Sequence, residues 1–499
     1  MATISSLPAE LLFHVFLLVA QSAEDLRIRF LKGERTAADS PEPPPVNGGT
    51  TSREIRLANL RAPPPYSWIR VTHVCRSWYN LAANSPLLWG HIAVVGEKVT
   101  MEMMGRATGV PLTVIFAMSN DQRTRVDILR NIITARAAQI EMLVVPPTPG
   151  IFNLLTSSFA VQASRLRTLL LIEPTRDSEP LHGPPANVHI PFPFPALEHF
   201  ESTAFWGPVT HLCASTLKVL VLTSGHRGTD ELNERLYITL AKLTRALCQT
   251  PLLEHLDVKL NDSVAQPPVP VELSHLKSVR LIGATSICAL FLRLARMHSM
   301  AKVIMKCMHG GTGRWPPSMV PDVICSVIAD PSRVDTSRFR PLRTVSICSK
   351  CYDHELRGWR TLVELGDERD DPEPDVYLTI PASSRLEDVL VLLGTFPFRE
   401  AQSLRQGCFL WHEDPSATFR CAQALCSMPQ LRQLTLDDIY PEFACELIEM
   451  TSATESLTLS RIDCNASLRN VQVIQMVAKA TDRNWLNIPR CPCLLTAVS

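Results

Sequence analysis

The chain has 499 residues, 46% of them hydrophobic, which is enough for a large buried core. Lysine plus arginine and aspartate plus glutamate both number 49, so the formal net charge is zero. A balanced charge produces no overall field that would attract DNA, RNA or an anionic membrane surface. We therefore expect neither a nucleic-acid partner nor a membrane partner.

The N-terminus bears on the cellular compartment. Residues 11–20 are apolar, but Pro8 and Glu10 stand where a signal peptide needs basic residues, and the run is too short to span a bilayer. Proline and glycine interrupt the uncharged stretch at 142–164. We expect an intracellular protein, cytoplasmic or nuclear, in which most of the 15 cysteines stay reduced.

The first predicted element is an amphipathic helix over residues 7–19. Pro8 suits the first helical turn because it has no N–H to leave unpaired, and Glu10 complements the positive end of the helix dipole. Apolar residues then recur at helical spacing, at Leu11, Leu12, Val15, Phe16 and Val19. This pattern predicts one wide apolar stripe.

A second helix is predicted over residues 69–83, with an apolar face that includes Val74, Cys75 and Trp78. Asn84-Ser85-Pro86 ends it, and Leu87-Leu88-Trp89 follows as an aromatic plug. Between the two helices, residues 22–66 form a polar, proline- and glycine-rich insert with little to bury, for which we expect disorder.

Three pieces in this order resemble the F-box family: Leu7-Pro8-x-Glu10-Leu11-Leu12-x-x-Val15-Phe16, then Val74-Cys75-Arg76-x-Trp78-x-x-Leu81-Ala82, then Ser85-Pro86-x-Leu88-Trp89. The resemblance covers residues 4–95. The insert departs from ordinary F-boxes. Long inserts at this place are typical of F-box-like proteins from mushroom-type (basidiomycete) fungi, which the chain resembles.

The resemblance implies that a small helical domain docks onto a Skp-type adaptor, which links it to a cullin scaffold and a RING subunit. The residues that it implies for adaptor binding are Leu7, Pro8, Leu11, Leu12, Val15, Phe16, Val74, Cys75 and Trp78. They would be buried partly in the domain's own core and partly against the adaptor. The alternative is that both helices only cap the rest of the chain.

Beyond residue 160 a short phrase recurs: Leu, two residues, an apolar residue, one residue, an apolar residue. It begins at Leu166, Leu217, Leu253, Leu276, Leu342, Leu386 and Leu431, with weaker copies at Leu197 and Leu457. The last two apolar positions are two residues apart and predict one side of a β-strand. Helical patterns at 229–250 and 417–428 precede two of these phrases.

Residues 246–258 align without a gap with residues 424–436, which indicates a repeated unit of helix end, proline and strand. The array resembles a degenerate leucine-rich-repeat solenoid, an α/β fold with a strand and a helix per repeat. An ordinary α/β domain is the alternative. The expected domains are 1–95 (F-box-like), 96–160 (linking or capping) and 161–499 (repeats). Ligand-facing candidates are Lys218, Glu254, His255, Lys277, Arg343, Glu387, Arg432 and Gln433.

Motifs for catalysis and cofactors are missing from the sequence. It contains no phosphate-binding loop, dinucleotide fingerprint, nucleophile elbow or H-E-x-x-H motif. Cys348, Cys351 and His354 supply only part of a zinc ligand set. We therefore expect no enzyme, cofactor or metal.

Together these expectations describe a substrate-recognition subunit of a Skp-cullin-F-box type ubiquitin ligase, which binds an unknown protein target through its repeats. The alternative is a non-catalytic repeat scaffold whose N-terminal helices only cap the solenoid.

Overall fold

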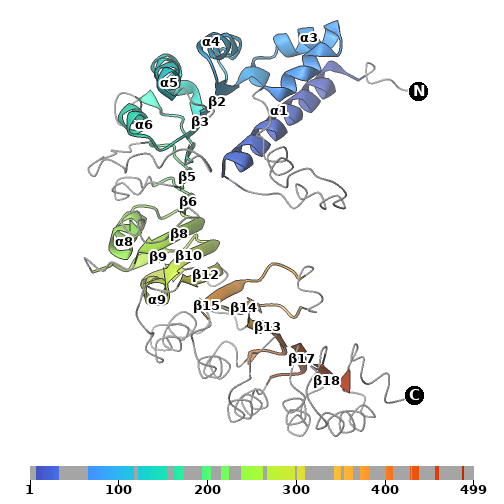
Figure 1. Cartoon of the computed structure of the whole chain (residues 1–499), viewed down its shortest axis with the longest axis vertical. Helices are drawn as coiled ribbons and strands as arrows, with labels where there is room; N and C mark the ends of the chain where they lie inside the picture. Colours follow the sequence, from blue (N-terminus) through green and yellow to red (C-terminus); the bar gives the residue numbers. More distant parts are fainter. Residues whose placement is uncertain are drawn as a thin grey trace, which may run out of the picture. The chain divides into compact units, whose positions relative to one another are not determined.

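A computed structural model gives the structure of the chain (Figure 1). The described residues are 7–32, 66–116, 122–155, 159, 162–172, 194–203, 215–223, 238–261, 267–297, 301–308, 342–349, 353–363, 371–381, 400–407, 428, 430–437, 456–459 and 486–487. The chain divides into two compact units: Met1–Ile238 with Arg245–Leu253 (unit 1), and Thr239–Thr244 with Glu254–Ser499 (unit 2). None of the helices within the described ranges has the length and apolarity to cross a membrane.

Unit 1 begins with helices and continues as alternating strands and helices. Its elements are α1 (Ala9–Lys32), η3 (Ser67–His73), α3 (Arg76–Ala83), η4 (Pro86–Trp89), β1 (His91–Val94), α4 (Glu97–Arg106), β2 (Leu112–Phe116), α5 (Gln122–Arg136), η5 (Ala137–Gln139), β3 (Ile140–Val145), α6 (Pro149–Leu154), β4 (Thr168–Leu171), β5 (His199–Ser202) and β6 (Val219–Leu222). Strands β1 to β6 pair in chain order, all parallel.

The first strands of unit 1 are apolar on both faces. Register places Val114, Leu143 and Leu169 in one row, and all are buried. On the opposite face Ile115, Val144 and Leu170 form a second buried row. Strands covered on both sides read as continuous apolar runs, which is why β2 to β4 lack a polar alternation.

Helix α1 lies against this second face. Its Ile28 packs on the buried cluster of Ile115, Val144, Leu170 and Ile172. In Figure 1, α5 and α6 lie on one side of the strands of unit 1 and α1 on the other. The second half of α1 therefore covers this face of the sheet, while its first half packs against η3, α3 and η4.

The structure corrects two expectations for unit 1. The first helix continues to Lys32, so residues 22–32 of the expected insert are helical; they bury Arg27 and half-bury Ile28. The helix expected over 69–83 is broken into η3 and α3 because Cys75 adopts an extended backbone with φ −160° and caps α3. Residues 96–160, expected to be a linking or capping region, contain β2 and β3 of the sheet.

Unit 2 is built mainly from strands. After β7 (Ile238–Thr239) and α8 (Leu240–Leu247), which contain the unit boundary, come β8 (His255–Asn261), β9 (Val271–Leu273), β10 (Ser278–Ala284), α9 (Thr285–Leu294), β11 (Ala295–Met297), β12 (Lys302–Met308), β13 (Thr344–Ser349), β14 (Asp353–Trp359), β15 (Val376–Pro381), β16 (Ser403–Gly407), β17 (Gln433–Asp437), β18 (Ser456–Leu459) and β19 (Leu486–Asn487).

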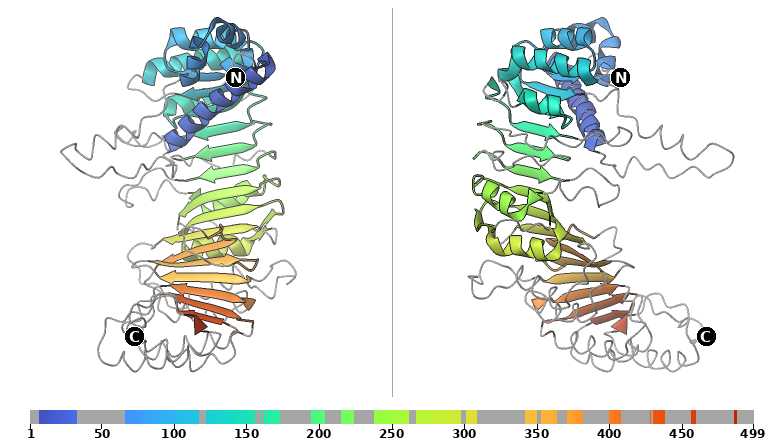
Figure 2. Two further views of the ribbon diagram at one scale, coloured as in Figure 1. Left: turned by 90° about the vertical axis from the view of Figure 1, so that its right-hand side faces the viewer. Right: turned by 60° about the vertical axis from the view of Figure 1, so that its left-hand side comes forward.

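The main strands of unit 2 lie side by side in the order β8, β10, β12, β15, β14, β13, β16, β17, β18, β19, drawn from green to red in Figure 2. All pairs are parallel except those of β14 with β13 and β15. One face is aliphatic: Val258, Leu281, Met305 and Leu378 are in register and buried. Helix α9 contacts β8, β10 and β12.

Each leucine phrase that falls on described residues coincides with a strand. In full copies the strand starts two residues after the first leucine, as β4 starts at Thr168 after Leu166 and β17 at Gln433 after Leu431. Ion pairs join neighbouring repeats just before their strands. Lys218 Nζ lies 2.8 Å from Glu198, and Lys277 Nζ lies 2.5 Å from Glu254. The phrase at Leu386 lies outside the described residues, as does the helical pattern at 417–428 except for Met428. Within 229–250 only Leu240–Leu247 is a described helix.

Some strands were not predicted because another residue takes the place of the first leucine. Register aligns Ile140 of β3 with Leu166 and Ala401 before β16 with Leu431, and both are buried. Strand β14 pairs antiparallel with both of its neighbours, so it departs from the repeated pattern of parallel strands. The fold is thus α/β with mostly parallel sheets, as expected.

Candidate docking surface

Four elements form the N-terminal module: α1, η3, α3 and η4. Two aromatic pairs make its core. Phe16 and Trp78 have ring centroids 5.0 Å apart at 61°, and Trp68 and Trp89 lie 5.0 Å apart at 62°. Such edge-to-face pairs contribute beyond their buried area. The core joins α1 to α3 and η3 to η4, so it holds the module together across the long insert.

Trp89, part of the expected aromatic plug, contacts both α3 and α4. Its indole N–H donates a hydrogen bond of 2.9 Å to the carbonyl of Ala82. The Arg106 guanidinium carbon lies 4.4 Å from the Trp89 ring centroid, and an Arg106 nitrogen bonds Glu102 at 2.7 Å. Trp89 is buried, so this segment links the module to α4 and the sheet of unit 1.

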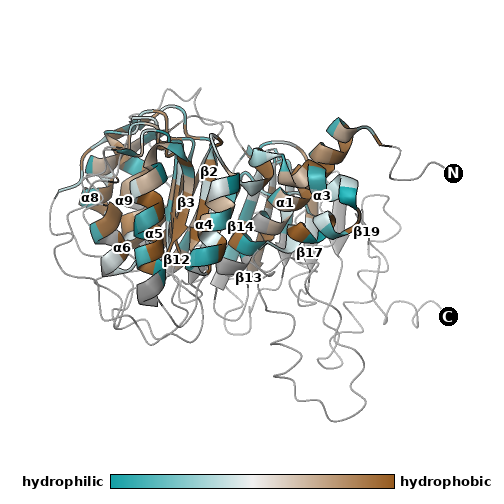
Figure 3. Cartoon of the chain, turned by 90° about the horizontal axis from the view of Figure 1, so that it is seen from above, coloured by the Kyte–Doolittle hydropathy of each residue, from teal (hydrophilic) through white to brown (hydrophobic). Residues whose placement is uncertain are grey.

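Helix α1 carries apolar residues on two opposite faces. Leu12, Phe16 and Ala20, four residues apart, are buried. Leu11 and Leu18 are 54% and 62% exposed, and Val15 lies between them on the same side. Figure 3 shows the N-terminal part of α1 coloured largely as hydrophobic. A helix that is apolar all round is normally buried all round, so the exposed face of α1 lacks a cover within the described chain.

The residues implied for adaptor binding fall into two sets. Leu12, Phe16 and Trp78 belong to the module core. The others are exposed on the module surface: Leu7, Pro8, Leu11, Val15, Val74 and Cys75. Val74 and Cys75 lie at the corner between η3 and α3, where the break in the expected helix turns them outward.

Further exposed apolar residues on the module were not expected from the sequence to bind a partner. Leu18 on α1, Tyr79 on α3 and Leu87 on η4 are each about half exposed. The spacing of Leu11, Val15 and Leu18 could have identified the outer stripe of α1, because steps of four and three keep residues on one helix face. The single wide stripe of the sequence analysis combined the outer and inner faces.

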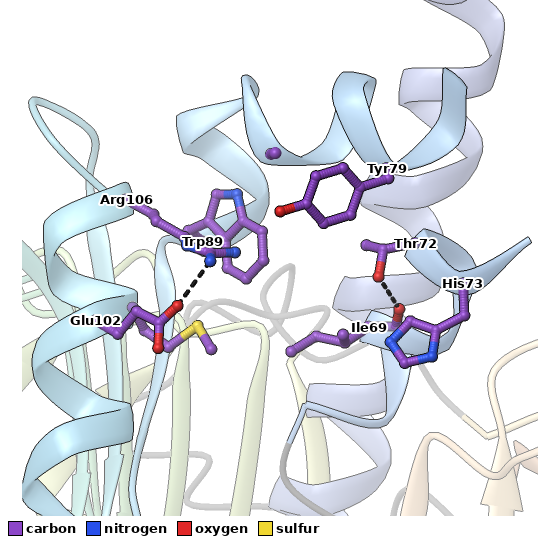
Figure 4. A pocket seen from close by; sticks show the side chains of 9 residues that line it. Ile69, Thr72, His73, Tyr79, Trp89, Glu102 and Arg106 are labelled. Carbon is purple, nitrogen blue, oxygen red and sulfur yellow. Dashed lines mark hydrogen bonds and ion pairs between the residues drawn. The ribbon is translucent and has the colours of Figure 1, made fainter. Parts of the chain in front are cut away.

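A cavity of about 230 Å³ lies between α3, η3 and α4. Figure 4 shows Tyr79, Trp89, His73 and Thr72 around it, with Arg106 and Glu102 beside Trp89. The Thr72 hydroxyl donates to the Ile69 carbonyl at 2.7 Å. The cavity is smaller than the ~300–1,000 Å³ of pockets for drug-sized ligands, so it suits a single side chain better.

The residues expected to face a ligand in the repeats lie mostly elsewhere. Lys218, Glu254 and Lys277 precede their strands and engage in the lateral ion pairs. The Lys218 ammonium accordingly holds the pKa of Glu198 below its usual value. His255 contacts the Ser278 hydroxyl at 2.7 Å. Arg343 and Arg432 also precede strands, Gln433 begins β17, and Glu387 lies outside the described residues.

Of the expected residues, His255 and Gln433 lie on the open face of their strands and are exposed. Other side chains on the open face of unit 2 were missed. They occupy the position between the two apolar residues of each phrase and the next position beyond them. Examples are Asp257, Lys259, Arg280, Lys306 and Arg357. In the part of the chain that the structure describes, no group of histidine, cysteine and carboxylate side chains could hold a metal ion, and Cys351 of the weak zinc pattern lies outside it.

Comparison with protein-family models gives no match for this chain, and comparison with curated proteins gives no significantly similar sequence.

Proposed function

We propose that the chain is the substrate-recognition subunit of a Skp-cullin-F-box type ubiquitin ligase. The observation that carries the proposal is the outer face of α1, where Leu11, Val15 and Leu18 are exposed although they stand on a folded module. Leaving one such side chain in water forfeits about 1.5–3 kcal/mol relative to burying it. A helix with this second apolar face fits a partner that covers it.

The sequence motif supports an adaptor of the Skp type as that partner. Six of the nine residues that the F-box resemblance implies are exposed, and the other three hold the module core on which the exposed ones stand. A docking surface needs both sets, because a rigid core positions the contact residues before binding.

The proposed mechanism is effective concentration. The module binds the adaptor, and through it the cullin scaffold, while the repeat region holds a target protein near the ubiquitin-conjugating enzyme. No side chain of this chain needs to touch the reacting thioester, so the proposal requires no catalytic residue. Because such ligases act inside the cell, the proposal places the chain in the cytoplasm or nucleus.

The finer fold assignment is part of this proposal. We infer that the parallel strands are units of a degenerate leucine-rich-repeat solenoid. Support comes from the constant offset between the first leucine of each phrase and the start of its strand. The lateral ion pairs between successive repeats support it as well. Stacked repeats bury each other's apolar faces, as the aliphatic row through Val258 and Leu281 does.

A second function has one observation in its favour. Ile28 of α1 packs on the unit 1 sheet, and Arg27 is buried. This contact makes the second half of α1 a cap for the sheet, as a plain repeat scaffold would need. It does not involve Leu11 or Val15, which leaves the outer face of α1 unexplained.

Adaptor capture by the full chain separates these functions. The test variant is Leu11→Lys, which places a charge on the outer face of α1, and the matched control is Leu252→Lys, at an exposed leucine outside the module. We expect the wild-type chain and the control to capture a purified Skp-type adaptor and the test variant to lose it. Absence of capture by the wild-type chain would overturn the receptor role and leave the scaffold.

A further inference from the structure

The cavity between η3, α3 and α4 is walled mainly by rings and apolar side chains. Tyr79 and Trp89 line it together with Ile69, Ala83 and Met103. In Figure 4 the Tyr79 hydroxyl points toward Trp89. All of these residues belong to unit 1, so the cavity is formed within one compact part of the chain.

Polar groups in the wall of the cavity already have partners inside the protein. The Trp89 indole N–H donates to the carbonyl of Ala82 at 2.9 Å, and the Thr72 hydroxyl donates to the carbonyl of Ile69 at 2.7 Å. These groups lose nothing when the cavity is filled by an apolar group, because their hydrogen bonds remain.

The charged residues at the cavity neutralise each other. The guanidinium carbon of Arg106 lies 4.4 Å from the Trp89 ring centroid, and an Arg106 nitrogen bonds Glu102 at 2.7 Å. A charged side chain that entered the cavity would lose its water and meet a like charge beside the opposite one. The electrostatics of the cavity therefore favour an uncharged occupant.

The rings in the wall favour a ring as that occupant. Aromatic side chains attract one another in offset or edge-to-face arrangements beyond what their buried area contributes. Met103 adds a thioether, which makes favourable contacts with the edge of a ring. A volume of about 230 Å³ is below the ~300–1,000 Å³ of pockets for drug-sized ligands, so one side chain suits it better.

The cavity lies beside exposed residues that the F-box resemblance implies for adaptor binding. His73, which lines the cavity, directly precedes exposed Val74 and Cys75. The Tyr79 amide bonds the Cys75 carbonyl at 3.0 Å, so these two residues stand one helical turn apart on one face of α3. Tyr79 itself is 49% exposed. A partner that covers Val74 and Cys75 is therefore within reach of the cavity.

We propose that this cavity is an anchor pocket for one uncharged aromatic side chain of the adaptor. The inference rests on the proposed function and deepens it, because it names the chemistry of the adaptor residue that the module recognises. Tyr79 and Trp89 contact the incoming ring. A few aromatic side chains in such pockets commonly supply most of the affinity of an interface. Complete burial of one of them corresponds to roughly one to two powers of ten in affinity.

Filling the cavity from its own wall tests the proposal. Ala83 is a half-buried lining residue at the end of α3, so Ala83→Leu places additional carbon atoms in the cavity. The matched control is Ala135→Leu, the same exchange at an exposed position of α5. Calorimetric titration of the full chain with a purified Skp-type adaptor measures affinity. We expect Ala83→Leu to fold like the wild type but bind at least about tenfold more weakly, and the control to match the wild type.

A small aromatic probe reports on the cavity without the adaptor. The probe is p-cresol, which is the tyrosine side chain without its backbone, and ligand-observed NMR compares it with methylcyclohexanol, its ring-saturated analogue. We expect p-cresol to bind the wild-type chain and the Ala135→Leu control, and to bind Ala83→Leu at least about tenfold more weakly. Methylcyclohexanol should bind the wild-type chain more weakly than p-cresol does.

Wild-type adaptor affinity in folded Ala83→Leu would overturn the anchor pocket and leave the receptor role intact. Equal binding of the two probes would overturn the aromatic preference. If Ala83→Leu lowers the unfolding midpoint, Tyr79→Ala decides instead, because it removes a half-exposed ring from the wall, and unchanged adaptor affinity there would overturn the proposal. Binding of p-cresol by a wild-type chain that captures no adaptor would support the aromatic site but overturn the receptor role, and with it the adaptor as the source of the ring.

Discussion

The N-terminal module and the sheet of unit 2 place their apolar side chains in opposite ways. In the sheet, aliphatic rows such as Val258, Leu281 and Met305 are buried, and the open face carries charges. In the module, α1 buries Phe16 on one face and exposes Leu18 on the other. The sheet satisfies its apolar surface within the chain, whereas the module leaves apolar side chains exposed on α1. An exposed apolar stripe on a packed module is therefore more informative about docking than a charged face.

The largest expected effect comes from the cores, where the two regions should behave alike. Phe16→Ala and Leu281→Ala each remove a fully buried side chain and should lower the free energy of unfolding by about 3–5 and 2–5 kcal/mol, respectively. Chemical denaturation followed by tryptophan fluorescence and by circular dichroism measures both. A cost below about 1 kcal/mol for Phe16→Ala would contradict the core assigned to the module.

A smaller, pH-dependent effect tests the environment of His91, the first residue of β1. Burial lowers the pKa of His91 below its ordinary 6.5, and the charge of Asp25 on α1 opposes that shift in part. The unfolded chain therefore takes up a proton more readily than the folded one as the pH falls below about 6.5, so folding stability should fall there.

The slope that His91 adds cannot exceed about 1.4 kcal/mol per pH unit, the value for one proton. Thermal unfolding between pH 7.5 and 5.5 measures it, and His91→Gln should flatten the profile. An unchanged profile in His91→Gln would show that the partial burial of His91 does not lower its pKa.

The lateral ion pairs of the repeats should matter least for stability. Lys277→Ala removes the bond to Glu254, but the lysine is 64% exposed and the carboxylate 30%, so the expected cost is only ~0–1 kcal/mol. Urea denaturation at low and high salt measures it. A larger loss that persists in high salt would mean that the pair is more than a surface contact.

The strands of the repeats could be predicted from sequence because their phrase is local. A leucine followed by alternating apolar residues requires only neighbouring positions, and Leu217, Leu253 and Leu276 each precede a strand. Strands such as β3 were not predicted because Ile140 occupies the position of the first leucine of the phrase. The antiparallel strand β14 was not predicted because its pairing depends on other strands and not on a local sequence pattern.

The candidate site was predicted in part. The motif identified both sets of module residues, but periodicity alone could not separate the inner face of α1 from the outer one, because both are apolar and only packing distinguishes them. The extension of α1 to Lys32 depends on the contact of Ile28 with the sheet, and no local sequence pattern predicts that contact. The open face of unit 2 required the register between strands.

The most direct test alters only the outer face of α1. Val15→Ser with Leu18→Ser alters only exposed side chains, so the unfolding midpoint should stay at the wild-type value, within about 0.5 kcal/mol. Calorimetric titration of this variant with a purified Skp-type adaptor should show binding at least about a hundredfold weaker than that of the wild-type chain. Wild-type affinity in the folded variant would contradict the docking role of the outer face of α1.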